Sequence, residues 1–221
     1  MLRAVMDTNV LYSAFRSRLG ASFAVFVALR HDRWRAVLSN HLLHEYEELL
    51  KARASELNLS VADIDTLLDA ICARAEEWKL APGWIPILAD PDDEPLVQLA
   101  YDSGARRIIT HNQRDLAPAR SLGIEVCRHR SVASARVFSH ARYVMTLHVK
   151  LSESLAAQAR ELAEREHTTV DALIASSLVA TLDHSPHRPT ISERAARVDW
   201  ARVDAILARV AEVPPEAGDE R

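Results

Sequence analysis

The first 127 residues alternate short apolar runs with amphipathic stretches of helical period, and this alternation limits the fold more than any other feature. Apolar runs that predict strands occupy residues 2–6, 35–39, 106–110 and 123–127. Helical patterns occupy residues 21–31, 40–53, 60–79 and 95–102. Strands that alternate with helices predict an α/β fold with a parallel sheet covered on both faces. In such sheets, functional groups gather at the carboxyl ends of the strands.

The composition narrows the class of protein further. The net charge of −4 means that any nucleic-acid-binding surface must be local. Cys72 and Cys127 lie far apart and outside any metal-binding spacing, which favours a reducing cytoplasm over a disulfide framework. Asp7 interrupts the region where a signal peptide would be apolar, and no apolar run approaches the ~20 residues of a membrane span. We expect a soluble, cytoplasmic protein without a membrane partner.

Acidic and amide side chains follow successive predicted elements of this sheet. They are Asp7 after the first strand, Glu45 in the next helix, Asp92, Asp93 and Glu94 after a proline-rich loop, and Asn112 and Asp115 after the strand 106–110. Two carboxylates ~4 Å apart repel by about 4 kcal/mol at an effective dielectric near 20, so a clustered set requires a cation. Oxygen ligands favour Mg²⁺ or Mn²⁺, which can activate water for phosphodiester cleavage.

Each acid taken alone has a simpler explanation. Asp7 could cap a turn, and the segment DPDDEP could be a solvated helix N-terminus. The ordered set at successive strand ends is what favours a site. His41 and His44 with Glu45 do not have the spacing of the helical zinc-protease motif, and we interpret both histidines as exposed helix residues.

Four motifs in order resemble the PIN domain. They are DTNVLYSA, SNHLLHEYEELL, ADPDDEPLVQLAYDSGARRIITHNQRDL and GIEV, and the resemblance covers about residues 2–128. It implies a three-layer α/β fold and an endoribonuclease that needs Mg²⁺ or Mn²⁺. Many members are toxins of bacterial toxin–antitoxin pairs.

The resemblance also assigns roles to residues. It carries the metal-binding acids onto Asp7, Glu45 and Asp93. Asn112 stands where many members have aspartate, so Asp115 or a water would complete the catalytic set. Supporting hydrogen bonds around the ligands would come from Thr8, Asn9, Asn112 and Asp92.

The alternation of strand and helix patterns ends after residue 128. Residues 129–143 form a basic linker that could be a protease site. Residues 144–183 have a strand of period two followed by two helical patterns, and they resemble the ribbon-helix-helix fold. This resemblance implies a homodimer or tetramer whose paired strands place Thr146, His148 and Lys150 in the major groove of operator DNA. The alternative is a dimerisation module that does not bind DNA.

In the tail, residues 184–221, the sequence predicts one amphipathic helix followed by a loose end, PPEAGDER. It resembles the toxin-binding tail of antitoxins, which implies an inhibitory segment. Trp200 would dock on the nuclease, and arginines such as Arg202 and Arg209 could reach its carboxylates. The alternative is that the tail packs on its own chain as ordinary core, away from the active site.

Together these features predict a metal-dependent endoribonuclease of toxin–antitoxin type, held inactive by a fused antitoxin-like DNA-binding module. The competing hypothesis is a ribbon-helix-helix transcriptional regulator with a nuclease fold weakened at Asn112. A structure-specific DNA nuclease is a third hypothesis, which the small size of the chain disfavours. The sequence leaves open which RNA is cut.

Overall fold

The computed structural model describes residues 1–128 and 189–220, together with positions 158–160, 162, 165 and 170. The chain divides into two compact units, Met1–Val144 with Thr190–Arg221, and Met145–Pro189. The predicted DNA-binding residues Thr146, His148 and Lys150 and the linker 129–143 lie outside the described residues. Among the helices that are described, none has the length and apolar character needed to cross a membrane.

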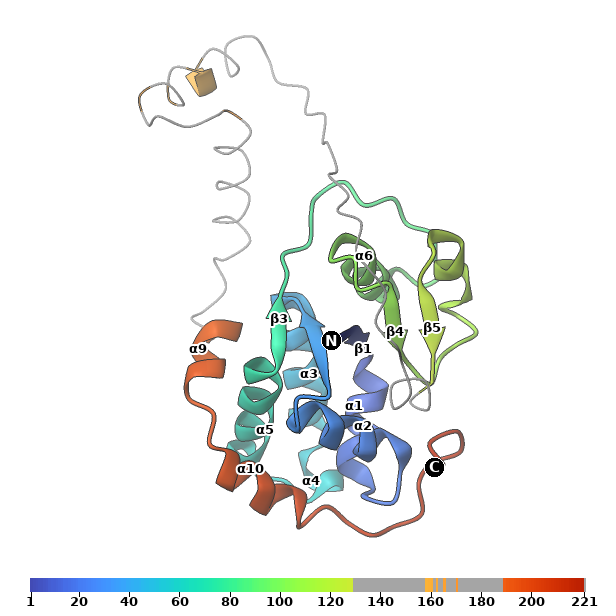
Figure 1. The fold of residues 1–221 in the computed structure, drawn as a ribbon, viewed down its shortest axis with the longest axis vertical. Helices are drawn as coiled ribbons and strands as arrows, with labels where there is room; N and C mark the ends of the chain where they lie inside the picture. The colour runs from blue at the N-terminus through green and yellow to red at the C-terminus, as the bar shows by residue number, and fades with distance from the viewer. Residues whose placement is uncertain (129–157, 161, 163–164, 166–169, 171–188, 221) are drawn as a thin grey trace. The chain divides into compact units, whose positions relative to one another are not determined.

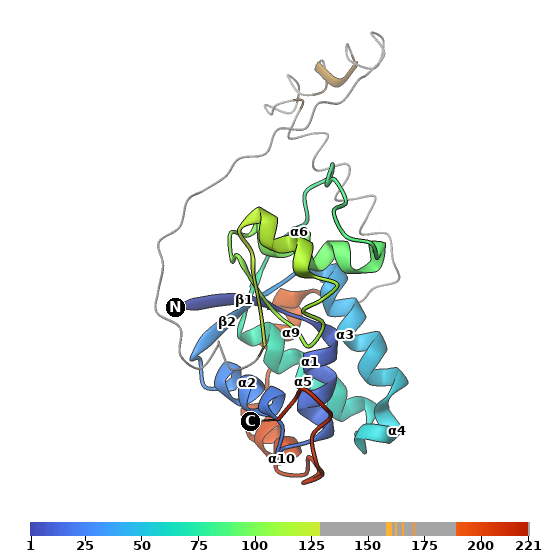
Figure 2. The same cartoon turned by 90° about the vertical axis from the view of Figure 1, so that its right-hand side faces the viewer.

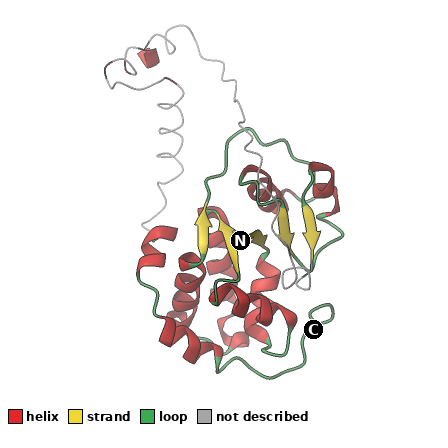
Figure 3. Ribbon diagram, in the orientation of Figure 1, coloured by secondary structure: helices red, strands yellow, loops and turns green. Residues whose placement is uncertain are grey.

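A five-stranded parallel sheet forms the centre of the first unit (Figure 3). Its strands are β1 (Leu2–Met6), β2 (Trp34–Leu38), β3 (Ala75–Glu77), β4 (Arg107–Ile109) and β5 (Glu125–Cys127), in the order β3-β2-β1-β4-β5. Ala4 pairs with Ala36 on one side of β1, and Val5 pairs with Ile108 on the other. The predicted parallel α/β sheet is confirmed.

The connections between strands explain why helices cover both faces. Those after β1 and β2 contain α1 (Thr8–Arg16), α2 (Ala21–Arg30), α3 (Asn40–Ala52), α4 (Ala54–Leu57) and α5 (Val61–Ala73). The connection after β3 contains the 3₁₀ turn η1 (Pro91–Asp93) and α6 (Glu94–Asp102), and it returns to the other side of β1. Because parallel crossovers are right-handed, this reversal places α6 on the opposite face from α1 to α5. Figure 2 shows β1 and β2 between α6 and the pair α1 and α5.

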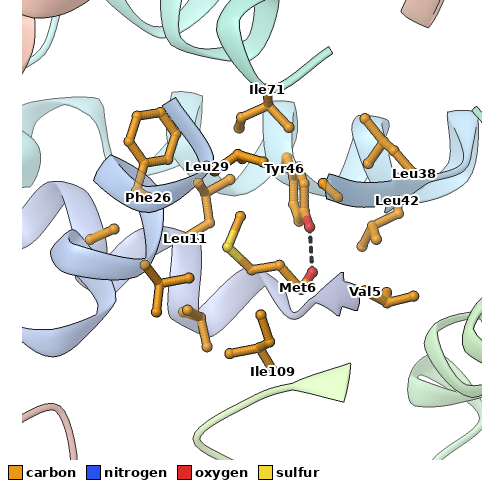
Figure 4. Close-up of a cluster of buried hydrophobic side chains, with 14 of the residues drawn as sticks. Val5, Met6, Leu11, Phe26, Leu29, Leu38, Leu42, Tyr46, Ile71 and Ile109 are labelled. Carbon is orange, nitrogen blue, oxygen red and sulfur yellow. Dashed lines mark hydrogen bonds between the residues drawn. The ribbon is translucent and has the colours of Figure 1, made fainter. Parts of the chain in front are cut away.

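Local sequence signals set the starts of the helices that flank the sheet. Asp7 accepts a hydrogen bond from the Asn9 backbone, and Ser39 accepts one from the Leu42 backbone, so each caps a helix directly after a strand. Between sheet and helices, the fully buried Tyr46 donates its hydroxyl hydrogen to the Met6 carbonyl (Figure 4). This bond ties α3 to the end of β1, one residue before Asp7.

Helix α1, helix α4 and strand β3 of the nuclease unit were not predicted from the sequence. Residues 8–16 form helix α1, which we did not predict. The helix predicted to run to residue 79 ends at Ala73, and Ala75–Glu77 form strand β3 at the edge of the sheet. Alanine and glutamate favour helices, so the strand depends on tertiary contacts. Ala75 pairs with Ala36, and Arg3 donates from Nε to Glu76 Oε2 at 2.7 Å.

The tail also differs from its prediction. It forms two short helices, α9 (Ile191–Ala196) and α10 (Trp200–Leu207), instead of one, because Asp199 starts a new helix by accepting a hydrogen bond from the Arg202 backbone. Both helices pack against α5 (Figure 1). The segment after α10 is not loose. It hydrogen-bonds to residues 17–22 of the nuclease unit through Ala211, Val213 and Asp219.

Candidate active site

The candidate site lies where the strand order reverses. On one side of β1 the chain continues to β2 and then β3. On the other side lies β4, which is followed by β5. In parallel α/β sheets, the carboxyl ends of two such strands border a crevice that binds ligands. Asp7 follows β1 directly, and Thr110 follows β4 directly. The Asp7 backbone donates to the Ile109 carbonyl at 2.9 Å, which joins the two strand ends.

Asp7 is buried and surrounded by hydrogen-bond donors. Thr110 donates from its hydroxyl to Asp7 Oδ2 at 2.6 Å, and Asn9 donates from Nδ2 to the same oxygen at 2.7 Å. Thr8 donates its hydroxyl hydrogen to Asp7 Oδ1 at 3.2 Å. The expected contacts of Thr8 and Asn9 are therefore present. Sequence analysis missed Thr110, although its place at the end of the strand beside β1 was a usable signal.

Glu45 reaches the site from α3 and contacts a histidine on its own helix. His41 Nδ1 lies 3.3 Å from Glu45 Oε1, one turn away. The hydrogen bond to Glu45 raises the pKa of His41, and partial burial opposes that rise. His41 is exposed, as we predicted, and it contacts the Glu45 carboxylate, whereas His44 is partly buried.

The acidic segment before α6 divides into three different roles. Asp93 is partly buried, whereas Asp92 is exposed and its backbone bonds to Asp90 Oδ1 at 3.0 Å. Glu94 is buried and accepts hydrogen bonds from Trp84 Nε1 at 2.6 Å and from the Ile87 backbone. Glu94 therefore fixes the proline-rich loop, and Asp93 is the acid of this segment that is left for the site.

Asn112 and Asp115 form a turn after β4. The Asn112 backbone donates to Thr110 Oγ1 at 2.8 Å, and the Asp115 backbone donates to Asn112 Oδ1 at 3.4 Å. Asp115 is exposed, and Asn112 is partly buried. Asn112 thus shapes the turn that carries Asp115 and links it to the Thr110 hydroxyl that binds Asp7.

The pKa of Asp93 is raised by burial and by the charges of other acids. Burial is the largest cause that raises its pKa to about 6, and the charges of Asp7, Asp90, Asp115 and Glu45 raise it further. Four separate elements therefore place negative charge near one carboxyl group. Asp90 was missed in the sequence because it precedes the proline and seemed part of the loop.

The donor set fits a hard divalent cation held by few protein ligands. Within the described residues, no three histidine, cysteine, aspartate or glutamate side chains converge as one ligand group. Mg²⁺ is commonly held by one or two carboxylates with water in the remaining positions, so three convergent side chains are not required. The raised pKa of Asp93 indicates charge that a cation would neutralise.

A family model for the PIN domain matches residues 3–114. The chain belongs to the PIN-domain family. The matched range contains Asp7, Glu45 and Asp93 and ends one residue before Asp115. Comparisons with curated proteins and with solved structures found no match. PIN domains are generally metal-dependent nucleases, which supports a nuclease site at these acids.

The structure places the predicted inhibitory residues of the tail on a different surface of the PIN domain. Arg209 Nη2 lies 3.0 Å from Asp63 Oδ1 at the start of α5. Trp200 lies between Arg30 and Arg74, whose guanidinium carbons are 4.3 and 4.7 Å from the ring centroid. Arg202 is exposed. In the described structure these side chains contact helices α2 and α5, or solvent, rather than the acids around Asp93.

Proposed function

We propose that this chain is a Mg²⁺- or Mn²⁺-dependent endoribonuclease of toxin–antitoxin type. The observation that carries the proposal is the Asp7 carboxylate held by Thr110 and Asn9 at the switch point of the sheet. There, burial and the charges of Asp7, Glu45 and Asp115 raise the pKa of Asp93 to about 6. RNA is proposed as the substrate from the resemblance to toxin PIN domains. The same proposal includes a cytoplasmic location.

The residues of the site have separate tasks in this proposal. Asp7, Asp93 and Glu45 would hold the divalent ion, one or two of them directly and the rest through bound water. The ion would supply an activated water and neutralise charge on the phosphodiester. Thr110, Asn9 and Thr8 hold the Asp7 carboxylate in one orientation through three hydrogen bonds. His41 holds Glu45. The turn that begins at Asn112 brings Asp115 to the open side of the cluster, where it can accept a proton from water.

We further propose that residues 144–183 form an antitoxin-like module that binds operator DNA and joins chains into homodimers or tetramers. The supporting pattern is the alternation of apolar and polar residues in this part of the sequence. It predicts a strand with Thr146, His148 and Lys150 on one face. Docking of residues 190–219 on the PIN domain supports restraint of the nuclease within its own chain. The transcriptional regulator remains the second candidate, favoured by Asn112 in place of an acid.

The test of the nuclease is cleavage of total RNA by the full chain, compared with Asp93→Asn and its neighbour Asp92→Asn. Asp93→Asn removes a charge from the converging acids and should lower the cleavage rate at least about a hundredfold with either metal. Asp92→Asn removes the same charge from an exposed side chain and should change the rate less than about threefold.

Three results would count against the proposal. Equal losses in both variants would remove the special role of Asp93. Cleavage of single-stranded DNA in preference to RNA of the same sequence would favour the DNA nuclease. Absence of cleavage with either metal, combined with salt-resistant binding to a DNA fragment from its own promoter, would favour the regulator.

A further inference from the structure

The end of the tail places a carboxylate at the beginning of helix α2. The Ser22 backbone donates to Asp219 Oδ1 at 2.8 Å, and the Ala21 backbone donates to the Asp219 carbonyl at 2.8 Å. Helix α2 has Gly20 at its N-cap and no side-chain cap of its own. Helix N-termini attract anions because their backbone N–H groups point outward and carry partial positive charge. Asp219 occupies such a position.

This carboxylate is sealed from solvent but incompletely bonded. Asp219 is 1% exposed, and its Oδ2 has no hydrogen-bond partner among the described residues. A buried anionic oxygen without a donor is costly, so the docked tail holds this carboxylate at the helix N-terminus against a desolvation penalty. A phosphate carries the same sign of charge, and its remaining oxygens would stay in solvent when the tail is displaced.

Gly20 leaves space for the Asp219 carboxylate because it has no side chain. Its φ of −70° is accessible to any residue, so the backbone does not require glycine there. A Cβ at Gly20 would lie 2.1 Å from Asp219 Oδ2, which is far inside contact distance. The absence of a side chain therefore serves the bound anion.

The surroundings of this site are basic, and the tail covers them with acids. Arg16 Nε lies 3.2 Å from Glu216 Oε1, and Arg18 Nη1 lies 3.1 Å from Glu212 Oε1. The tail thus sets a row of carboxylates against two arginines and a helix N-terminus. Such a row of negative charge on positive charge resembles the way a nucleic-acid backbone meets a protein.

One histidine connects this site to the candidate active site. His111 Nε2 lies 3.1 Å from Ser22 Oγ and 3.9 Å from Asp219 Oδ1. Its backbone donates to Asn9 Oδ1 at 3.3 Å, and Asn9 donates to Asp7. His111 therefore links the N-terminus of α2 to the Asp7 site through Ser22 and Asn9.

We propose that Gly20, Ala21, Ser22 and His111 form an anion site for a backbone phosphate of the RNA strand, and that Asp219 occupies it when the tail is docked. Arg16 and Arg18 would bind the adjoining phosphates. The inference rests on the proposed function for the identity of the strand. It also gives the tail a means of restraint that needs no arginine in the active site, namely competition for substrate.

The test measures RNA binding by the full chain in EDTA, so that binding is observed without cleavage. Fluorescence anisotropy of a short labelled single-stranded RNA compares the wild type with Asp219→Ala and Glu220→Gln. Asp219→Ala vacates the anion site and should bind about tenfold more tightly, because charge-assisted hydrogen bonds to phosphate replace those to the carboxylate. Glu220→Gln removes the same charge from an exposed neighbour, keeps an oxygen that can accept from the Gly218 backbone, and should leave the affinity unchanged.

Gly20→Ala combined with Asp219→Ala provides the second control, because the added methyl group fills the vacated space. This double variant should lose the gain and return to wild-type affinity. If Asp219→Ala does not fold, as judged by its melting curve, a chain that ends at residue 217 replaces it and should show the same gain.

Three outcomes would overturn the proposal. They are no gain in Asp219→Ala, an equal gain in Glu220→Gln, and a gain that survives Gly20→Ala. Inorganic phosphate that raises the melting temperature of Asp219→Ala without a change in RNA affinity would assign the site to free phosphate instead. Since EDTA removes the metal, a failure of nuclease activity would not alter these results, and the two proposals can fail separately.

Discussion

The acids around Asp69 and the acids around Asp93 belong to the same domain but meet different partners. Arg194 of the tail is 2% exposed and places Nη1 3.1 Å from Asp69 Oδ1 and Nη2 3.3 Å from Glu47 Oε2. Around Asp93, the neighbouring charges that shift its pKa are all negative. In the described structure, no arginine or lysine forms an ion pair with Asp93. The first group is neutralised within the chain, and the second is left for a ligand.

This difference shows how structural and functional acids can be told apart. Buried carboxylates that serve the fold have a matching cation nearby, because an unpaired buried charge is costly. Carboxylates that bind a metal bear this free-energy cost until the metal ion neutralises them. The tail supplies cations to α3 and α5 and leaves the acids after β1 and before α6 without them.

The largest expected effect comes from removing the cation of the neutralised group. Arg194→Met removes the buried cation between Asp69 and Glu47, which keep only the more exposed Arg197 and Lys51. It should lower the free energy of unfolding by about 3 kcal/mol. Urea unfolding of the full chain measures it. Arg197 also pairs with Asp69, at 2.8 Å, but its side chain is 47% exposed. Arg197→Met should therefore cost less than about 1 kcal/mol. Equal costs would mean that burial does not distinguish the two pairs.

A smaller effect is expected from the acids that lack a cation. The pKa of Asp93 in the folded chain, about 6, lies above its ordinary value, so the folded state holds this proton more tightly than the unfolded state. Stability from this group is present below about pH 4 and is lost as the pH rises toward 6.

Melting curves across this pH range, with EDTA and with Mg²⁺ or Mn²⁺, measure that effect. Metal should raise the melting temperature above pH 6 and have little effect near pH 4, where the carboxyl group is protonated. Asp93→Asn should melt higher than wild type in EDTA above pH 6 and should lose most of the metal response. A metal response that is independent of pH, or unchanged in Asp93→Asn, would place the ion elsewhere.

The smallest effect is expected where Trp200 of the tail lies against two arginines of the PIN domain. Trp200→Leu keeps an apolar side chain but removes the ring between Arg30 and Arg74, which should cost about 1 kcal/mol of unfolding free energy. Arg202→Ala, at an exposed neighbour, serves as the control and should cost nothing measurable. A loss as large as that of Arg194→Met would show that apolar docking, rather than charge, holds the tail.

Local sequence signals were sufficient for the strands around the site and for the acids that follow them. Leu2–Met6 was predicted with its observed bounds, and the strand ends led directly to Asp7 and to the turn that begins at Asn112. The prediction failed where a distant partner decides the structure. Residues 75–77 favour a helix alone and become a strand only because β2 offers an open edge.

Dependence on distant partners also limited the prediction of side-chain roles in the site and in the tail. Thr110 acquires its role only when β4 lies beside β1, and His41 only when α3 turns toward Glu45. The apolar positions of the tail were identified from their period, and Val203, Ile206 and Leu207 are indeed buried. The partners of its arginines depend on how α9 and α10 meet α5, which no local pattern encodes.

The pairing of Arg194 with Asp69 has a consequence for synthesis of the chain. The two residues are 125 positions apart, so a ribosome that adds ~5–20 residues per second makes the arginine roughly 6–25 s after the aspartate. The rest of the sheet, from β3 to β5, is translated within that interval, before Asp69 can meet Arg194. We therefore expect the sheet to form first and the tail to dock on α5 in a later step of folding.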